Sequence, residues 1–289
     1  MARVLSFFRL LTGLAYMAVA GGLFFAVCLV LLPSRKLRIA ATNVFGHVTG
    51  RVCLWLTGTS VKTDAVEQMK KLHPAIYVSN HTSITDIWIA IMVCPTFTCG
   101  VAKKEIVRYP FFGQLYWISG HLRVDRGNKL SAMRSLKRTG EMVREQGLGI
   151  WIWAEGTRSP DGKLMPLKKG FAHLAMATKL PVVPVVVKGA HKGWRKHEML
   201  FSKSTVEVEV LAPIPTDDWT SKNLDERLAH VHAVMNAALP EDQRGPPMVV
   251  VPRRVRPAKA AALAAAAASA VTADGVDDTA AIPAAAEAV

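Results

Sequence analysis

The sequence predicts an α/β protein in which helices flank a mixed central sheet and a hydrophobic membrane helix lies at the N-terminus. Between residues 75 and 239, short runs rich in β-branched residues alternate with longer segments of helical periodicity. Residues 10–32 form a run of 23 positions without a charged side chain. In the run 206–210, Val alternates with Glu, which places one face of that strand in water.

Length and charge limit the kinds of protein to consider. At 289 residues and 51% hydrophobic composition, the chain can build one sizeable core with additional segments. The net charge of +14 favours a polyanionic partner, which can be nucleic acid, anionic lipid headgroups or a phosphorylated substrate. The four cysteines have no CxxC or Cys/His ligand spacing, so the sequence predicts neither a zinc site nor a disulfide scaffold.

The uncharged run 10–32 is long enough for a membrane helix, since about 20 apolar residues cross a bilayer. The run continues well past the small residues at 18–20, which favours an uncleaved anchor over a signal peptide. The basic cluster Arg35, Lys36 and Arg38 favours a membrane protein whose catalytic domain lies on the cytoplasmic face. A helix lying within one leaflet is the alternative.

Composition divides the chain into three parts. Residues 1–60 are expected to form membrane-anchoring helices, the second of them near 41–60, and residues 61–240 to form the main domain. Residues 241–289 are rich first in Pro and Arg and then in Ala, so we expect a disordered tail. Within the domain the expected strands are 75–79, 97–102, 122–124, 149–153, 182–187 and 206–210, and the expected helices are 83–93, 130–143, 171–179 and 224–239.

The turn after the strand 75–79 carries the most informative polar cluster. Ser83 and Asp86 have the spacing of a capping box, so a helix beginning at Ser83 leaves His81 just outside it. A histidine on the incoming turn can fold back to a carboxylate in the first helical turn. Asp86 would then fix the tautomer of His81, as a general base requires. The alternative is that Asp86 only caps the helix and His81 is an ordinary turn residue.

Other segments carry charge or aromatic side chains next to strand ends. The sequence has no G-x-S-x-G elbow, no G-x-x-x-x-G-K-[ST] loop and no HExxH, which removes the commonest hydrolase, NTPase and zincin hypotheses. Lys103 and Lys104 precede an aromatic patch at 109–117, which suits an apolar tunnel or a membrane contact. Packing of these aromatic side chains into the core is the alternative interpretation.

Four short blocks in order resemble the glycerolipid acyltransferases, specifically the 1-acyl-sn-glycerol-3-phosphate acyltransferases. They are Asn80-His81 with Asp86, the segment 120–126 ending in Arg126, the run Glu155-Gly156-Thr157-Arg158-Ser159, and Val183-Pro184-Val185. The resemblance covers about residues 70–215. Trp153-Ala154 stands where the family usually has Phe-Pro, and Arg123 occupies a position that is usually apolar.

The resemblance implies transfer of a fatty acyl group from acyl-CoA or acyl-carrier protein to the sn-2 hydroxyl of lysophosphatidic acid, which gives phosphatidic acid. His81 would be the general base and Asp86 its orienting carboxylate. The acceptor's phosphate calls for donors, and the candidates are Arg126, Gly156, Thr157, Arg158, Lys103 and Lys104. Glu155 is left between pairing with an arginine and contacting the substrate.

The expected partners are the lysolipid, the acyl donor and membrane lipids, with no nucleic acid, no metal and no further cofactor. Backbone amides near Ser83 are candidate oxyanion donors. Two other functions stay open at this point. One is acyl transfer to a different lysolipid, and the other is a non-enzymatic, membrane-tethered module that binds anionic lipid or nucleic acid through its positive charge.

Overall fold

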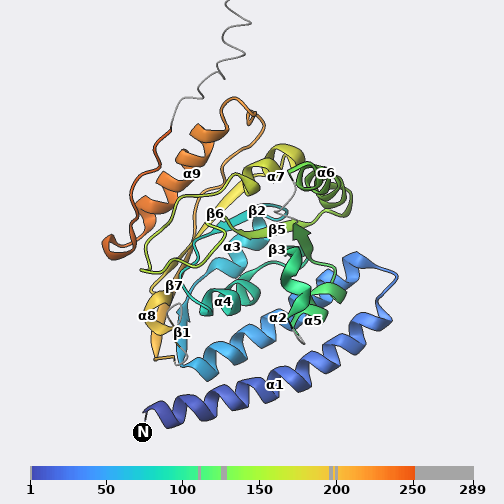
Figure 1. Ribbon diagram of the computed structural model, residues 1–289, viewed down its shortest axis with the longest axis vertical. Helices are drawn as coiled ribbons and strands as arrows, with labels where there is room; N and C mark the ends of the chain where they lie inside the picture. The colour runs from blue at the N-terminus through green and yellow to red at the C-terminus, as the bar shows by residue number, and fades with distance from the viewer. Residues whose placement is uncertain (1, 110–111, 125–128, 195–197, 199–200, 251–289) are drawn as a thin grey trace, which may run out of the picture. The chain divides into compact units, whose positions relative to one another are not determined.

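The computed structural model describes residues 2–109, 112–124, 129–194, 198 and 201–250, with the side chains of 2–5, 103, 124 and 129–137 left out (Figure 1). A seven-stranded sheet has the order β1-β7-β6-β2-β5-β3-β4. Its strands are β1 (Thr59–Lys62), β2 (Ile76–Ser79), β3 (Thr98–Lys103), β4 (Leu122–Val124), β5 (Gly149–Trp153), β6 (Val182–Lys188) and β7 (Ser204–Val210). β6 and β7 are antiparallel and the other neighbouring pairs are parallel. The expectation of a mixed sheet is therefore confirmed.

The central strands are buried on both faces, and their alternating side chains supply two separate cores. Ile76 and Val78 of β2 pack in a cluster with side chains of α7 (Gly170–Thr178) and α9 (Leu224–Ala238). Tyr77, which points the other way, packs with side chains of α3 (Ala65–Lys71) and α4 (Thr85–Val93). α6 (Lys129–Gln146) lies beside α7 (Figure 1). Helices thus cover both faces, as uniformly apolar central strands require.

The helix α2 (Arg35–Thr57) is part of the folded domain, because it packs tightly on α4. A Cβ atom added at Gly50 would lie 2.6 Å from the carbonyl oxygen of Trp88, so only glycine permits this approach. The buried Asn43 donates to the carbonyl of Thr98 at 2.9 Å and accepts from its amide at 3.1 Å. β1 (Thr59–Lys62) spans the boundary expected at residue 60, and α2 packs on a helix that lies beyond it.

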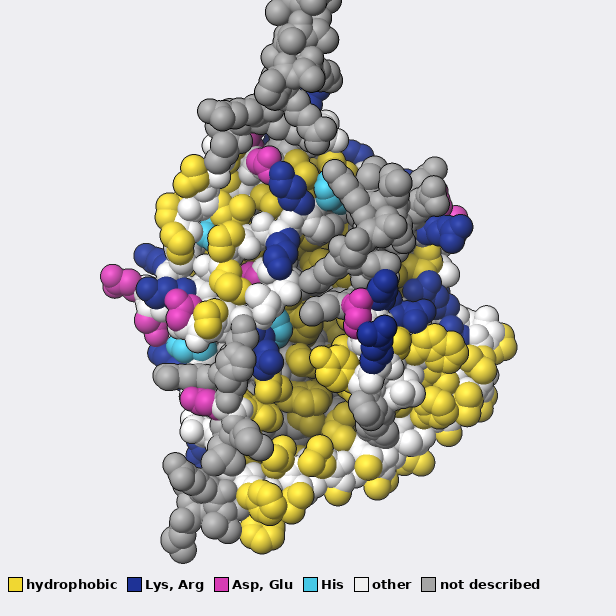
Figure 2. Space-filling view, in the orientation of Figure 1, with side chains coloured by type: hydrophobic (Ala, Val, Ile, Leu, Met, Phe, Trp, Pro, Cys, Tyr) yellow, Lys and Arg dark blue, Asp and Glu magenta, His cyan; other side chains and the backbone are white. Residues whose placement is uncertain are grey.

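The helix α1 (Ala2–Val30) lies along α2, and much of its surface is apolar and exposed. Its exposed apolar side chains include Phe7, Phe8, Leu11, Leu14, Val19, Leu23, Val27 and Val30. Figure 2 shows hydrophobic side chains along the lower edge of the molecule, where Figure 1 places α1. Within the described part of the chain, Ser6–Val30 is the one helix long and apolar enough to cross a membrane.

Several elements differ from the sequence-based expectation. α4 begins at Thr85 rather than Ser83, and the aromatic patch contributes the 3-10 helix η1 (Lys104–Arg108) and the helix α5 (Phe112–Ile118). The short elements β1 and α3 were not expected. Residues 241–250, expected to belong to a disordered tail, are folded onto the domain and contain the 3-10 helix η2 (Glu241–Gln243). The rest of the expected tail, from residue 251, lies outside the described residues.

Candidate active site

The site is built where β2 ends and the chain turns into α4. Asn80, the first residue after β2, is buried and bridges to the neighbouring strand β6. Its side-chain nitrogen donates to the carbonyl of Val187 and its side-chain oxygen accepts from the Val187 amide, both at 2.8 Å. These two bonds fix the turn to the sheet just before His81.

His81 and Asp86 make the side-chain contact that the sequence predicted. His81 Nδ1 and Asp86 Oδ2 are 2.9 Å apart, and the Asp86 side chain is fully buried. Because a carboxylate only accepts, this bond places the imidazole proton on Nδ1. Nε2 then carries the lone pair, and it makes no hydrogen bond with any described residue. The imidazole is 13% exposed, so the free nitrogen is accessible.

The backbone at the start of α4 serves Asp86 rather than a substrate. The amides of Thr82 and Ser83 donate to Asp86 Oδ2 at 2.6 and 2.8 Å. Of the amides near Ser83 that were candidate oxyanion donors, those of Thr82 and Ser83 are therefore already used by Asp86. The same bonds hold the carboxylate rigidly against the imidazole.

An indole ring packs against the imidazole. The rings of His81 and Trp153 are stacked, with their centroids 4.6 Å apart and their planes at 19°. Trp153 ends β5, and its register partner is Ser79 at the end of β2. The sequence showed Trp153 only as a departure from the family pattern. The neighbouring, parallel order of β2 and β5 would have revealed the contact, because their carboxyl ends meet at one edge of the sheet.

Glu155 fastens the turn of His81 to the loop after β5. One carboxylate oxygen accepts from the backbone N–H of His81 at 2.7 Å, and the other accepts from Met165 at 3.1 Å. Burial raises the pKa of the Glu155 carboxyl to about 8, although the two N–H donors act in the opposite direction. Glu155 is 1% exposed. The two roles expected for Glu155 stay predictions, and the structure adds a third, since both side-chain oxygens accept from backbone amides.

The rest of the loop lies against the same turn. The amide of Ser159 donates to the carbonyl of His81 at 2.7 Å, which brings Arg158 next to the site. Gly156 has φ +72°, a conformation that favours glycine. Thr157 is exposed and Arg158 half-buried. The structure therefore brings together His81, Asp86 and the run 155–158.

The remaining phosphate-binding candidates are less well placed by the structure. Lys103 ends β3, and its side chain lies outside the described part. Lys104 begins η1 and is exposed. Arg126 lies outside the described residues. The structure therefore describes the part of the predicted site that the run 155–158 forms, and it does not describe the part that Arg126 was expected to form.

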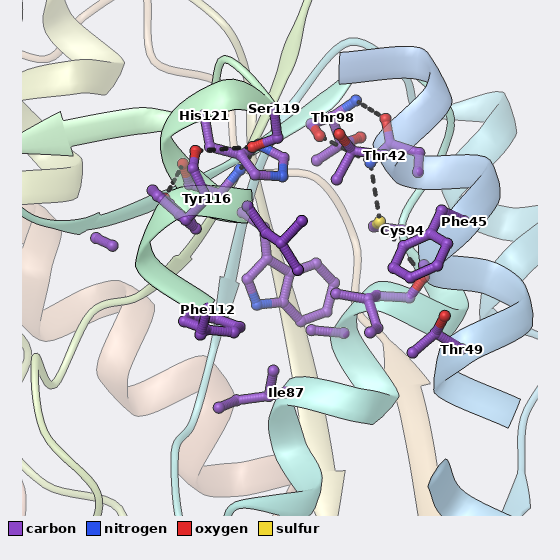
Figure 3. Close-up of a pocket in the computed structure, with 18 of the residues that line it drawn as sticks. Thr42, Phe45, Thr49, Ile87, Cys94, Thr98, Phe112, Tyr116, Ser119 and His121 are labelled. Atoms are coloured by element: carbon purple, nitrogen blue, oxygen red, sulfur yellow. Dashed lines mark hydrogen bonds between the residues drawn. The ribbon is translucent and has the colours of Figure 1, made fainter. Parts of the chain in front are cut away.

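Trp153 is also one of the residues that line an apolar pocket of about 250 Å³. Figure 3 shows it between Ile87 of α4, Phe45 and Thr49 of α2, and Phe112 and Tyr116 of α5. Burial lowers the pKa of His121, which also lines the pocket, to about 4, so this imidazole is uncharged at neutral pH. Phe112 and Tyr116 line the cavity and Trp117 is 57% exposed, which favours the tunnel or membrane contact over packing of the aromatic patch into the core.

Comparison with known proteins agrees with the geometry. A family model described as Acyltransferase matches residues 60–188. The chain is 40% identical over 227 residues to the 1-acyl-sn-glycerol-3-phosphate acyltransferase of Limnanthes douglasii, covering 78% of this chain and 79% of that protein. It is 32% identical over 197 residues to the protein of that name from Escherichia coli, covering 68% and 79%. The crystal structure of the 1-acyl-sn-glycerophosphate (LPA) acyltransferase PlsC from Thermotoga maritima has a similar fold, with a TM-score of 0.65, 22% identity, and coverage of 81% of this chain and 92% of that one.

The fold and the matched domain define the chain as an acyltransferase, and hence as an enzyme. The family relationship extends beyond the matched domain, because the curated relatives align over most of their own length. The chain belongs to the 1-acyl-sn-glycerol-3-phosphate acyltransferase family.

Proposed function

We propose that the protein transfers a fatty acyl group from acyl-CoA or acyl-carrier protein to the sn-2 hydroxyl of 1-acyl-glycerol-3-phosphate, giving phosphatidic acid. The observation that carries this proposal is the His81 imidazole, which Asp86 holds through Nδ1 while Nε2 stays unbonded among the described residues. The names of the relatives support the choice of acceptor.

The chemistry needs a base more than it needs a nucleophile on the protein. The thioester carbonyl of the donor is already activated, whereas the glycerol hydroxyl attacks only as its proton leaves. Nε2 of His81 takes that proton while the new C–O bond forms, and the C–S bond then breaks. The proton passes from His81 to the departing thiolate. Asp86 stabilises the imidazolium in between, and such a base contributes roughly 10²- to 10⁴-fold.

The run 156–158 supplies donors for the acceptor's phosphate. The guanidinium of Arg158 offers a planar fork, Gly156 lets the backbone approach closely, and Thr157 adds an exposed hydroxyl. Lys103, Lys104 and Arg126 are further candidates. Glu155 positions this run, because its side chain accepts from the backbone amides of His81 and Met165.

The apolar pocket suits a fatty acyl chain. Trp153, whose indole stacks on His81, lines this pocket, so we expect an acyl carbonyl held at the imidazole to place its hydrocarbon chain inside the cavity. Two polar side chains at its wall are hydrogen-bonded to the backbone: the Tyr116 hydroxyl shares its proton between the carbonyls of Gly100 and Leu122, and His121 accepts from the Gly100 amide. The lining therefore offers an uncharged surface to the chain.

The helical hairpin α1–α2 brings this site to a membrane surface. α1 lies along α2, and α2 in turn packs on α4, which carries Asp86. This packing favours an α1 that lies beside the domain at the bilayer. The basic residues Arg35, Lys36 and Arg38, which follow α1, favour the cytoplasmic face for the catalytic domain. A lysolipid would then reach the site from the membrane and a water-soluble donor from the other side. The reaction requires no metal and no cofactor besides the acyl donor.

The test uses the purified full-length protein in detergent with defined substrates. Acyl-CoA and acyl-carrier protein are each combined with lysophosphatidic acid, lysophosphatidylcholine or lysophosphatidylethanolamine, and the products are identified by mass spectrometry. The proposal predicts that phosphatidic acid forms fastest. Preference for an acceptor without a terminal phosphate would overturn the assignment of the acceptor, and absence of any transfer would overturn the reaction itself.

A further inference from the structure

The last described segment of the chain folds back onto the loop that carries the proposed acceptor site. After α9, the carbonyl of Gln243 accepts from the amide of Leu164 at 2.9 Å. Five residues later, the sulfur of Met248 accepts from the amide of Leu167 at 3.4 Å. We call residues 240–248 the C-terminal strap. It lies outside the region that the Acyltransferase family model matches.

The strap lies too close to the loop to be an incidental contact. A Cβ atom added at Gly245 would lie 1.8 Å from the carbonyl oxygen of Leu164, so the glycine is required by this approach. Asn236 of α9 fixes the backbone of Gly245 from the other side, with bonds of 2.9 and 3.1 Å to its amide and carbonyl. The strap is therefore held in one register against Leu164.

A short chain of hydrogen bonds connects the strap to the reaction centre. Leu164 precedes Met165, whose amide donates to Glu155, and Glu155 accepts from the backbone of His81. The Gln243 side chain also contacts the segment that follows β6, since its oxygen accepts from the amide of Gly189 at 2.7 Å. Gly189 follows β6 and is the N-cap residue of α8 (Ala190–Gly193). The next residue, Trp194, accepts through its carbonyl from the hydroxyl of Ser83 at 2.7 Å.

Gln243 thus joins the two segments that enclose the turn of His81. Its backbone holds the loop 155–168, and its side chain holds the end of β6. Gln243 is 1% exposed. Its side-chain nitrogen has no hydrogen-bond partner in the described part of the structure, so the oxygen is the atom that the fold uses.

We propose that Gln243 is a positioning residue for acyl transfer, which sets the loop 155–168 and hence Arg158 at the distance that the acceptor's phosphate requires. This inference rests on the proposed function. It predicts that loosening the strap impairs use of the lysolipid acceptor and leaves use of the acyl donor unchanged, because the donor's apolar pocket lies between α2, α4 and α5.

The experiment compares Gln243→Met with Gln243→Glu in the full-length protein. Methionine keeps the length of the side chain and removes the acceptor for Gly189, whereas glutamate keeps an oxygen there. Glu241→Ala, an exposed change in the same turn, is the control. For each variant, kcat and KM are measured with lysophosphatidic acid and with the acyl donor, together with the melting temperature in detergent.

We expect Gln243→Met to lower kcat/KM for the acceptor about 10- to 100-fold, the scale of a small displacement at a site. KM for the donor should stay within about twofold, Gln243→Glu should recover most of the loss, and Glu241→Ala should behave as wild type. If Gln243→Met does not fold, Met248→Leu is compared instead, because it removes the sulfur acceptor of Leu167 and keeps the volume.

Two results would overturn the inference. One is wild-type acceptor kinetics in Gln243→Met, or in Met248→Leu where the first variant is unfolded. The other is an equal rise in KM for donor and acceptor, which would indicate a general loss of structure. The wild-type protein separates this inference from the proposed function. If it fails to acylate lysophosphatidic acid, the proposed function is wrong, whereas wild-type turnover with unaffected variants refutes only the role of Gln243.

Discussion

The backbone N–H of His81 donates to the buried carboxyl group of Glu155 at 2.7 Å, while the same side chain accepts from Met165 at 3.1 Å. One acidic side chain therefore joins the turn that carries the imidazole to the loop that carries Arg158. In the run Glu155-Gly156-Thr157-Arg158, the first residue orders the backbone, and the later residues are those proposed to bind the acceptor's phosphate.

Glu155 should give the fold a specific pH dependence. Its pKa is raised from 4.5 to about 8, so the folded state holds a proton that the unfolded state has lost between these values. The associated stability is fully present below pH 4.5 and is lost as the pH rises through about 8. Glu155→Gln removes this titration. Across about pH 5 to 7.5, the wild type should lose on the order of 1 kcal/mol per pH unit relative to the variant, measured by unfolding in detergent. A constant difference would contradict the burial of this carboxyl group.

Arg158 should act on the acceptor and not on the donor. Arg158→Lys keeps the charge but cannot reproduce the planar fork, so we expect KM for lysophosphatidic acid to rise about tenfold, which corresponds to about 1.4 kcal/mol. KM for the acyl donor should be unchanged. Steady-state kinetics with each substrate varied in turn measure both constants. Arg144→Lys, an exposed change at the end of α6, is the control. Equal effects on both substrates would show that Arg158 does not bind the acceptor's phosphate.

Gly100 offers a way to reduce the apolar pocket without straining the fold. A Cβ atom added there would meet only the hydroxyl of Tyr116, at an ordinary contact distance of 3.7 Å. Gly100→Ala should therefore fold and discriminate against the longest acyl chains, on the order of tenfold in kcat/KM. Competition between donors of different chain length measures this shift. Gly22→Ala, where an added Cβ has nothing within 4 Å, is the matched control and should leave the profile unchanged.

Trp153 should orient the imidazole through its stacked ring. Trp153→Ala removes the stack at 4.6 Å and should lower kcat roughly 3- to 10-fold, the value of one aromatic pair. Trp153→Phe restores an aromatic face and should recover most of that loss. Because Trp153 also lines the pocket, the acyl-chain profile is measured alongside kcat. A loss confined to long-chain donors would contradict an orienting role.

Local patterns along the chain predicted the centre of the site well. The strand 75–79, the following turn and the start of α4 are consecutive, so the capping-box spacing was enough to anticipate the contact between His81 and Asp86. The apolar strands and the longer helices were likewise evident, since their burial imposes regular periodicity. The start of α4 was placed two residues early, because Ser83 and its amide belong to the turn.

The features that sequence patterns missed depend on contacts between distant segments. The strap at 240–248 is polar and rich in Pro and Gly, and its order comes from bonds to Leu164, Leu167 and Gly189, which lie far away in the chain. The stack of Trp153 on His81 depends on the neighbouring order of β5 and β2. β1 and α3 are short elements, stabilised by packing rather than by propensity.

The most direct test of the account is the turnover of His81→Ala with lysophosphatidic acid and an acyl donor, with circular dichroism and the melting temperature confirming that the variant is folded. If Nε2 of His81 is the base, kcat falls about 10²- to 10⁴-fold while KM for either substrate changes little. A folded His81→Ala variant that turns over within a few-fold of the wild type would contradict the mechanism.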